Sequence, residues 1–275
     1  MGEAKRREMN GDTAPKVAKP VGSTMITVGM VGIAIPSGDQ LHTDTAFALA
    51  SLTGNYRAPH TLISAKGCYV HKGRDHCQRI AAEKGCTHML FIDGDMLFPT
   101  VIGQLPNGNP ITPIHRLLAW NKDIVGCIYS RRVSPFTNLG TPSDKSITRS
   151  EPGTELLQMD MLPTGFMLIK MEVFDRITAH EKRRSPFFRF KPILSPTPNE
   201  HGNYDYIDEM GEDVYFCERA REAGCTLWAD IWLSHQLGHI GQAVYRVQDD
   251  TKAEAEAVGT PLHRPDTGRI AAVAQ

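Results

Sequence analysis

Apolar strand patterns alternate with helical patterns through the first half of the chain, and this alternation restricts the possible folds more than any other feature. Strands are expected at residues 25–35, 60–64, 87–92 and 123–129, and helices at residues 42–56, 75–84 and 112–120. Strands separated by helices are typical of βαβ units, which build parallel sheets. The alternation therefore predicts an α/β fold with a mostly parallel central sheet and flanking helices.

The second half of the chain has a less regular pattern. Two strands, at residues 156–162 and 165–170, are expected to be neighbours in the sheet. Residues 180–202 are rich in proline and charge, so they predict a long loop. The remaining expected elements are a short helix at residues 171–178, a helix at 212–223 and a strand at 226–233.

Local composition divides the chain into three parts. Residues 1–24 are polar and predict a flexible N-terminal tail, and residues 246–275 predict a C-terminal extension. One folded domain is expected between them, over residues 25–245. Its apolar run at residues 25–36 is much shorter than the roughly 20 residues that a membrane span needs, so no membrane span is expected.

The charge balance and the cysteines disfavour several classes of protein. Lysine and arginine total 30 and aspartate and glutamate 31, a net charge of -1, whereas proteins that bind nucleic acid through bulk electrostatics are usually basic. The six cysteines form no Cys-x-x-Cys pair, so their spacing predicts neither a zinc ribbon nor a thioredoxin-type site. They are expected to be reduced core residues of a cytoplasmic protein.

The most informative triplet is Asp93-Gly94-Asp95, which directly follows the apolar residues 89–92. Ligands of open α/β sheets bind at the carboxyl ends of the strands. Two aspartates separated by glycine can reach one small volume, and carboxylates suit a hard divalent cation that shares a substrate diphosphate. A solvated turn is the alternative, but apolar residues on both sides of the triplet disfavour it.

A second acidic group, Gly211-Glu212-Asp213, begins the predicted helix at residues 212–223. Acids are favourable at a helix N-terminus, but residues 205–213 hold five acids and no base, which exceeds what capping requires. One of these carboxylates could act as a general base toward a hydroxyl group. Downstream, His239 has glycines on both sides, which would let its ring approach a ligand closely.

In this order, the motifs resemble the family-2-like glycosyltransferases of bacteria and bacteriophages. The motifs that carry the resemblance are Pro36, Arg74-Asp75, Leu90-Phe91-Ile92-Asp93-Gly94-Asp95-Met96, Tyr129-Ser130-Arg131-Arg132, Pro163-Thr164-Gly165-Phe166, Gly211-Glu212-Asp213 with Phe216-Cys217, and Gly238-His239-Ile240-Gly241. The resemblance implies a single GT-A, Rossmann-like domain with an irregular C-terminal part. It also implies an enzyme that transfers a sugar from a nucleotide-diphosphate sugar.

The resemblance implies a role for each matching residue. Asp95 and His239 would bind Mn²⁺ or Mg²⁺, and Asp93 would contact the ribose or a metal-bound water. Glu212 or Asp213 would be the catalytic base, with Asp213 favoured. Nucleotide and sugar would be contacted by Ala34, Ile35, Pro36, Arg74, Asp75, Gly165 and Phe166.

The implied reaction is a direct displacement in which a carboxylate takes the proton of the acceptor hydroxyl. A metal and helix dipoles would stabilise the departing diphosphate. The acceptor remains open among a protein, a glycan, a lipid-linked sugar and a modified DNA base, and the oligomeric state remains open too. The implied location is the bacterial cytoplasm, or the host cytoplasm for a phage-encoded protein.

Two enzymes of other classes fit part of this sequence. A metal-dependent nucleotidyltransferase can also place acids after a strand, but it usually needs a glycine-rich phosphate loop, and neither G-x-x-x-x-G-K-[ST] nor G-x-G-x-x-G is present. A metal-dependent hydrolase would draw on four residues, namely Asp93, Asp95, His235 and His239.

A nucleic-acid-binding or zinc-binding module is the third alternative. It would use Cys68, His71, His76 and Cys77, whose spacing is poor for a closed tetrahedral site. Separately, residues 181–191 hold five bases and one acid. A solvated loop and a mobile basic segment that closes over the diphosphate or guides an anionic acceptor are both open for this stretch.

Overall fold

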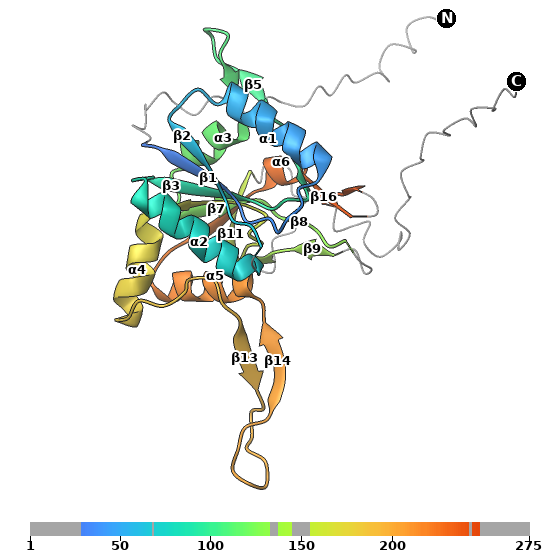
Figure 1. The fold of residues 1–275 in the computed structure, drawn as a ribbon. Helices are drawn as coiled ribbons and strands as arrows, with labels where there is room; N and C mark the ends of the chain where they lie inside the picture. Colours follow the sequence, from blue (N-terminus) through green and yellow to red (C-terminus); the bar gives the residue numbers. More distant parts are fainter. Residues whose placement is uncertain (1–28, 68, 133–136, 145–154, 242–243, 248–275) are drawn as a thin grey trace, which may run out of the picture.

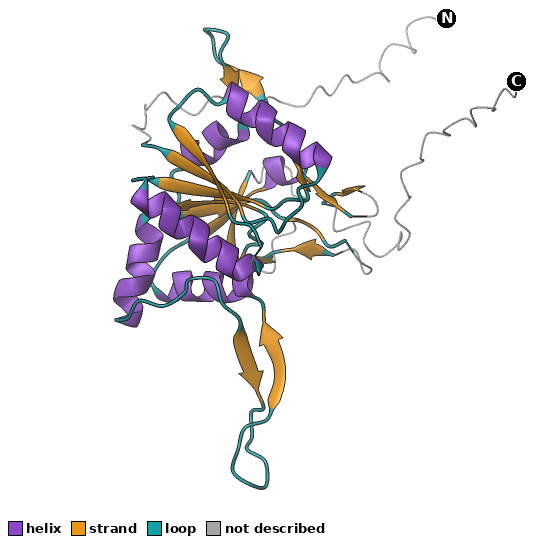
Figure 2. Cartoon of the chain, in the orientation of Figure 1, coloured by secondary structure: helices purple, strands orange, loops and turns teal. Residues whose placement is uncertain are grey.

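A computed structural model describes residues 29–67, 69–132, 137–144, 155–241 and 244–247. In these residues a central sheet of eight strands has helices on both faces (Figures 1 and 2). The expected N-terminal tail and nearly all of the C-terminal extension lie outside the described residues. No helix in the described ranges is long and apolar enough to cross a membrane.

The central sheet is mixed. Its order is β10 (Thr141–Pro142), β11 (Leu156–Met161), β15 (Leu227–Asp230), β7 (Ile124–Gly126), β12 (Phe166–Lys170), β3 (His88–Ile92), β1 (Val31–Ile35) and β2 (His60–Ser64). The pairs β1–β2, β1–β3 and β7–β15 are parallel, and the other pairs are antiparallel. Strands β11 and β12 alone run against the rest of this sheet, so the expectation of a mostly parallel sheet is confirmed for strand direction.

The expected pairing of the strands at residues 156–162 and 165–170 is wrong. They form β11 and β12, and β15 and β7 lie between them in the sheet. The reason lies in their side chains. The first four residues of β12 are all buried, as a central strand requires, whereas β11 alternates more and takes a place near the edge.

Two predicted strands are shorter in the structure than in the sequence pattern. Residues 123–129 divide into β7 and β8 (Tyr129–Ser130), and β8 pairs with β9 (Asn138–Leu139). The strand expected at residues 226–233 ends at Asp230, whose carboxylate accepts a hydrogen bond from the backbone N–H of Leu233. This N-cap begins the short helix α6 (Ile231–Ser234).

Most expected helices are present. They are α1 (Thr43–Asn55), α2 (Val70–Glu83), α3 (Pro113–Ala119), α4 (Glu172–Glu181) and α5 (Glu212–Glu222). Gly224 follows α5 with φ of 74°, the left-handed conformation that glycine adopts readily. Short strands β4 (Met96–Leu97), β16 (Gly238–Ile240) and β17 (Val244–Tyr245) form a separate sheet, and β5 (Gly103–Gln104) pairs with β6 (Pro110–Ile111).

The long loop predicted at residues 180–202 contains a strand. β13 (Lys191–Leu194) pairs with β14 (Tyr206–Met210), and this hairpin projects away from the sheet and helices (Figures 1 and 2). We call residues 191–210 the arm. The proline-rich composition of residues 180–202 predicted a loop, but a two-stranded hairpin has only edge strands, where a proline such as Pro192 is tolerated.

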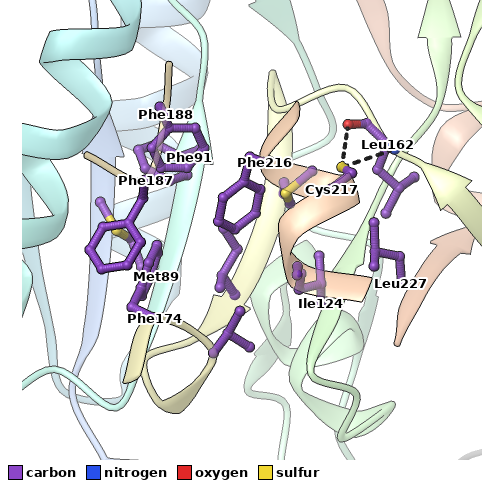
Figure 3. Packing of buried hydrophobic residues seen from close by; sticks show 14 of the residues in the cluster. Met89, Phe91, Ile124, Leu162, Phe174, Phe187, Phe188, Phe216, Cys217 and Leu227 are labelled. Atoms are coloured by element: carbon purple, nitrogen blue, oxygen red, sulfur yellow. Dashed lines mark hydrogen bonds between the residues drawn. The ribbon is translucent and has the colours of Figure 1, made fainter. Parts of the chain in front are cut away.

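Two apolar cores fill the spaces between the sheet and its helices. On one face, Phe91 of β3 packs with Phe174 of α4, Phe216 of α5 and Phe188 (Figure 3). On the other face, helices α1, α3 and α6 cover the sheet. The described cysteines, all except Cys68, are buried, which confirms the expectation that they are core residues.

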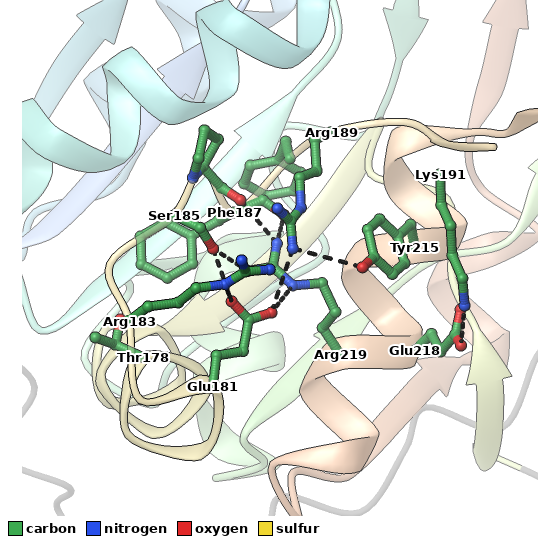
Figure 4. Close-up of polar contacts among 12 residues, drawn as sticks. Thr178, Glu181, Arg183, Ser185, Phe187, Arg189, Lys191, Tyr215, Glu218 and Arg219 are labelled. Carbon is green, nitrogen blue, oxygen red and sulfur yellow. Dashed lines mark hydrogen bonds and ion pairs between the residues drawn. The ribbon is translucent and has the colours of Figure 1, made fainter.

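The basic stretch at residues 181–191 is anchored to α5 by ion pairs (Figure 4). Glu181 binds the buried guanidinium of Arg219 and lies 3.6 Å from Arg189. Lys191 donates to Glu218 at 2.7 Å. Three of the five bases, with Arg183 included, thus face an acid in the structure, while Lys182 and Arg184 are exposed.

Removal of the Glu181 carboxylate is expected to destabilise the fold. Burial by itself raises the pKa of Glu181, but hydrogen bonds from Arg219 and Ser185 and the charges of Arg219 and Arg189 lower it to about 2. Because Glu181→Ala leaves Arg219 buried without its partner, we expect a loss of about 3–5 kcal/mol in the free energy of unfolding at neutral pH. Urea titration measures it, with the exposed Glu83→Ala as control.

The pH dependence provides a second measurement on the same residue. An acid whose pKa is lower in the folded protein contributes stability above its unfolded pKa, and this stability disappears as the pH falls toward about 2. Wild-type unfolding free energy should therefore decrease below about pH 4.5 more steeply than that of Glu181→Gln. Equal slopes for the two proteins would contradict this assignment.

Candidate functional site

The candidate site lies where β1 and β3 end and where α2 and α5 begin. Asp93 and Asp95 follow β3 directly, so they lie at the carboxyl edge of the parallel pair β1–β3. Arg74 is on the second turn of α2, and Glu212 is the first residue of α5. Ligands of open α/β sheets bind at this edge.

Arg74 joins three of these segments. Its guanidinium donates to both carboxylate oxygens of Asp93, at 2.8 and 3.0 Å, and also to Glu212. The Arg74 side chain is almost fully buried. Burial lowers its pKa, but the charges of Asp93 and Glu212 outweigh this and raise the pKa above the usual value. The guanidinium is therefore a permanent positive charge between two acids.

Asp213 lies beside this ion-pair cluster, and its environment disfavours its charged form. Burial raises the pKa of Asp213, and the charge of Glu212 raises it further, against the opposing effect of Arg74. Its carboxylate accepts a hydrogen bond from the backbone N–H of Val214 at 2.8 Å. Glu212 is bound to Arg74, so Asp213 is the better candidate for accepting a proton.

Asp95 and His239 face each other across two short strands. The backbone N–H of Ile240 donates to the Asp95 carbonyl at 2.8 Å, which aligns β16 with the segment after β3. Asp95 Oδ2 lies 3.6 Å from His239 Nε2 and 2.5 Å from Arg132 Nη1. Burial raises the pKa of Asp95, but the neighbouring His239 and the charge of Arg132 lower it overall.

The ring of His239 is fixed in orientation. Its Nδ1 lies 3.0 Å from the carbonyl oxygen of Ser130, which only accepts, so Nδ1 carries the proton of that hydrogen bond. Nε2 is then left to face Asp95. The Tyr129 ring packs edge-on against the imidazole, with centroids 4.9 Å apart. This is the support that metal-binding histidines usually have.

Tyr129 links the two parts of the site, a role that its place in the sequence does not reveal. Its hydroxyl accepts a hydrogen bond from the backbone N–H of Gly165 at 2.9 Å. Burial, together with the charges of Asp93 and Asp213, raises its pKa well above the usual value. A Cβ at Gly165 would lie 2.3 Å from the hydroxyl. Gly165 is therefore packed against Tyr129, and any larger residue at this position would clash with the Tyr129 side chain.

Arg132 likewise has a role that the sequence does not reveal. Both Arg132 and Tyr129 belong to the motif Tyr129-Ser130-Arg131-Arg132. Their side chains reach the site only because β8 lies beside β16. The glycines near the site leave room for side chains of other segments, which a Cβ atom would crowd. A Cβ at Gly94 would lie 3.3 Å from Leu41, and a Cβ at Gly238 would lie 2.4 Å from Val244. The glycines beside His239 thus allow close approach of a strand and of Arg132, while the close approach of a ligand stays a prediction.

An open pocket of about 440 Å³ adjoins Asp95. It is lined by Ser37, Gln40, Leu41, His42, Thr43, Gly94 and Asp95. Ile35 ends β1 and Pro36 follows it just before this pocket, and both are buried. Their predicted contact with a nucleotide stays a prediction, but the pocket is where residues after β1 meet the Asp93-Gly94-Asp95 turn.

The structure does not bring Asp75 into this cluster. Its carboxylate accepts hydrogen bonds from the backbone N–H groups of Phe187 and Phe188, at 2.8 and 3.2 Å. Burial raises its pKa, and these hydrogen bonds lower it in part. Asp75 therefore ties α2 to the segment before the arm.

The alternative sites fare differently. No group of three or more histidine, cysteine, aspartate and glutamate side chains is placed to hold a metal ion within the described residues. His235 directly follows α6 as its C-cap and His239 is in β16, so the two do not form the i, i+4 pair of a zinc helix. Of the cysteines expected in a zinc-binding module, Cys77 is buried in the hydrophobic core. Cys68 lies outside the described residues.

Comparisons with known proteins leave the function to the geometry of the site. No family model matches the chain, and no curated protein matches it. Among solved structures, the one titled "Crystal Structure of A197 from STIV" aligns with a TM-score of 0.46 and 14% sequence identity, over 86% of this chain and 100% of that chain. A likeness of this size assigns no activity.

Replacement of Arg74 tests the ion-pair cluster. Arg74→Ala leaves Asp93 and Glu212 buried in part without their shared cation, so we expect a loss of about 3–5 kcal/mol in the free energy of unfolding. Arg79→Ala, an exposed arginine on the same helix, should change it by less than about 0.5 kcal/mol. Urea unfolding monitored by circular dichroism measures both. Equal stability of the two variants would show that the cluster is not structural.

Proposed function

We propose that this protein is a metal-dependent glycosyltransferase that moves a sugar from a nucleotide-diphosphate sugar to an acceptor hydroxyl. One observation carries the proposal: the Asp95–His239 pair adjoins the cluster of Arg74, Asp93, Glu212 and Asp213 at the carboxyl edge of the sheet. A cation site next to a carboxylate of raised pKa is what this reaction needs. The GT-A fold is part of the proposal, supported by the order of the motifs along an α/β sheet.

The donor atoms near Asp95 are compatible with Mn²⁺ or Mg²⁺. Asp95 offers a carboxylate of lowered pKa, and His239 offers Nε2 because Ser130 holds its Nδ1 proton. Two protein ligands suffice for a cation whose other positions are filled by waters and substrate phosphates. When bound, the ion would stabilise the negative charge that develops on the diphosphate. Asp93, bound to Arg74, would contact the ribose or a metal-bound water.

The protein's own side chains would do the remaining work. Asp213 would take the proton from the acceptor hydroxyl, because its raised pKa makes it a better base than an ordinary aspartate. Arg74 would hold Glu212 and Asp93 in place. Arg132, about half exposed, can turn from Asp95 toward the diphosphate oxygens. The pocket after β1 would receive the nucleotide.

Loss of the Asp95 carboxylate is expected to abolish both metal binding and transfer. Asp95→Asn should weaken Mn²⁺ binding at least about tenfold, since second-shell changes alone reach that size. Mn²⁺ titration followed by electron paramagnetic resonance measures binding without any substrate. Hydrolysis or transfer of a panel of nucleotide sugars, with and without Mn²⁺, measures activity. Asp175→Asn, on an exposed position of α4, is the matched control.

The outcomes separate this proposal from its rivals. Metal-independent turnover, or full activity in Asp95→Asn, would overturn it. Unchanged Mn²⁺ affinity in a folded His239→Ala variant would remove His239 from the site while leaving the fold intact. Transfer of a nucleoside monophosphate would indicate a nucleotidyltransferase. Turnover of a substrate that is not a nucleotide sugar, by water alone, would indicate a hydrolase.

The pH profile identifies the base. A base acts only when deprotonated, so kcat/KM should decrease as the pH falls through a pKa above the usual aspartate value. Asp213→Asn should lower kcat at least about 100-fold. Glu212→Gln removes a charge that raises the pKa of Asp213, so it should retain activity and shift the acidic limb to lower pH. The opposite pattern, with Asp213→Asn active and Glu212→Gln inactive, would make Glu212 the base.

A further inference from the structure

The arm exposes large apolar side chains that the fold does not cover. Ile193, Leu194, Tyr206 and Ile207 are 39–62% exposed, and Tyr204 is 56% exposed. Leu194 lies opposite Tyr206 in the hairpin, and among the described strands β13 and β14 pair only with each other. An isolated two-stranded hairpin is marginally stable in water, and exposed apolar patches mark interaction sites. The arm is therefore a candidate binding surface.

The charge of the arm restricts its binding partner. Apart from Lys191, which pairs with Glu218, the arm contains Glu200, Asp205, Asp208 and Glu209 and no lysine or arginine. Asp208 and Glu209 are exposed on β14, next to the apolar residues. Nucleic acid and anionic lipid would be repelled by these acids, so the arm fits a partner with basic and apolar groups.

This chain carries such a surface at the root of its own arm. Lys72, Arg79 and Arg184 surround a pocket of about 410 Å³, and all three are exposed. Within the described ranges none of the three forms an ion pair with an acid. The segment that follows Arg184 leads into β13, and the Phe190 ring contacts the His71 ring of α2 with centroids 5.0 Å apart. We call these three bases the root patch.

We propose that two copies of the chain form a two-fold dimer through their arms. A two-fold axis across two arms places them antiparallel, so that the tip of each reaches the root of the other. The exposed apolar residues of the two arms then cover each other, and the acids nearest the tip, Glu200 and Asp205, approach the partner's root patch. A second copy satisfies both surfaces at once, whereas a basic peptide would cover only the arm and a polyanion only the root patch.

Sedimentation velocity of the full chain tests this dimer. The wild-type protein is expected to sediment with twice the mass of one chain, and Leu194→Asp with Tyr206→Asp should give the monomer. Phe47→Asp, which replaces a 74% exposed side chain on α1, should remain a dimer. The arm packs on no core, so at protein concentrations too low for dimerisation circular dichroism should show the same melting temperature for these variants as for the wild type.

Charge reversal tests the complementarity. A chain with Lys72→Glu, Arg79→Glu and Arg184→Glu should dimerise at least about tenfold more weakly, and so should a chain with Glu200→Lys and Asp205→Lys near the tip of the arm. Combining all five substitutions reverses both surfaces and should restore dimerisation. Arg57→Glu, on an exposed site after α1, should have no effect. Added salt should weaken the wild-type dimer, because it screens exposed charges.

Three results would overturn the proposal. The first is a wild-type monomer at concentrations up to about 100 μM, where an interface of standard size would be occupied. The second is a dimer that survives the arm substitutions. The third is an arm that binds an acceptor glycan or peptide as a monomer, which would make it part of the acceptor site. The dimer does not rest on the proposed glycosyl transfer, so failure of either leaves the other standing.

Discussion

The candidate site depends on the ion pairs that the buried guanidinium of Arg74 forms with two acids. This guanidinium binds Asp93 after β3 and Glu212 at the start of α5, and it comes from α2. Three segments far apart in the sequence are thereby held at one edge of the sheet. A buried cation without its acids, or the acids without their cation, would be strongly unfavourable. The same ion pair occupies the Glu212 carboxylate, whereas Asp213, of raised pKa, lies beside the cluster.

Much of the fold could be predicted because local patterns carried it. The alternation that gives β1, α1, β2, α2 and β3 is visible in the residues, and so is the helix α5 with Gly224 after it. The arm and the order of β11 and β12 could not be predicted. Proline in β13 obscured a strand whose partner, β14, lies on the far side of a long turn. The place of β12 depends on which faces of the sheet are covered, which is a property of the whole fold.

The candidate site divides in a similar way. The acids after β3 and at the start of α5 could be identified from their position beside apolar segments. The contact between Asp95 and His239, at 3.6 Å, required β16 to lie beside β4. The sequence motif contains Tyr129 and Arg132 but does not predict their roles. Tyr129 contacts Gly165 and His239, and Arg132 pairs with Asp95, only in the folded structure. Asp75, adjacent to Arg74, points elsewhere because neighbouring residues of a helix project about 100° apart.

The sequence by itself determined an α/β domain with acids at the carboxyl end of a buried strand and at the start of a helix. Both follow from short-range effects, namely hydrophobic periodicity and the preferences of helix ends. The tertiary structure alone decided which acids are paired, which one has a raised pKa and which histidine ring is held toward Asp95. It also decided that an acidic, apolar arm and a basic root patch lie on one chain. Burial and charge act through space, so residues distant in sequence set the chemistry of each group.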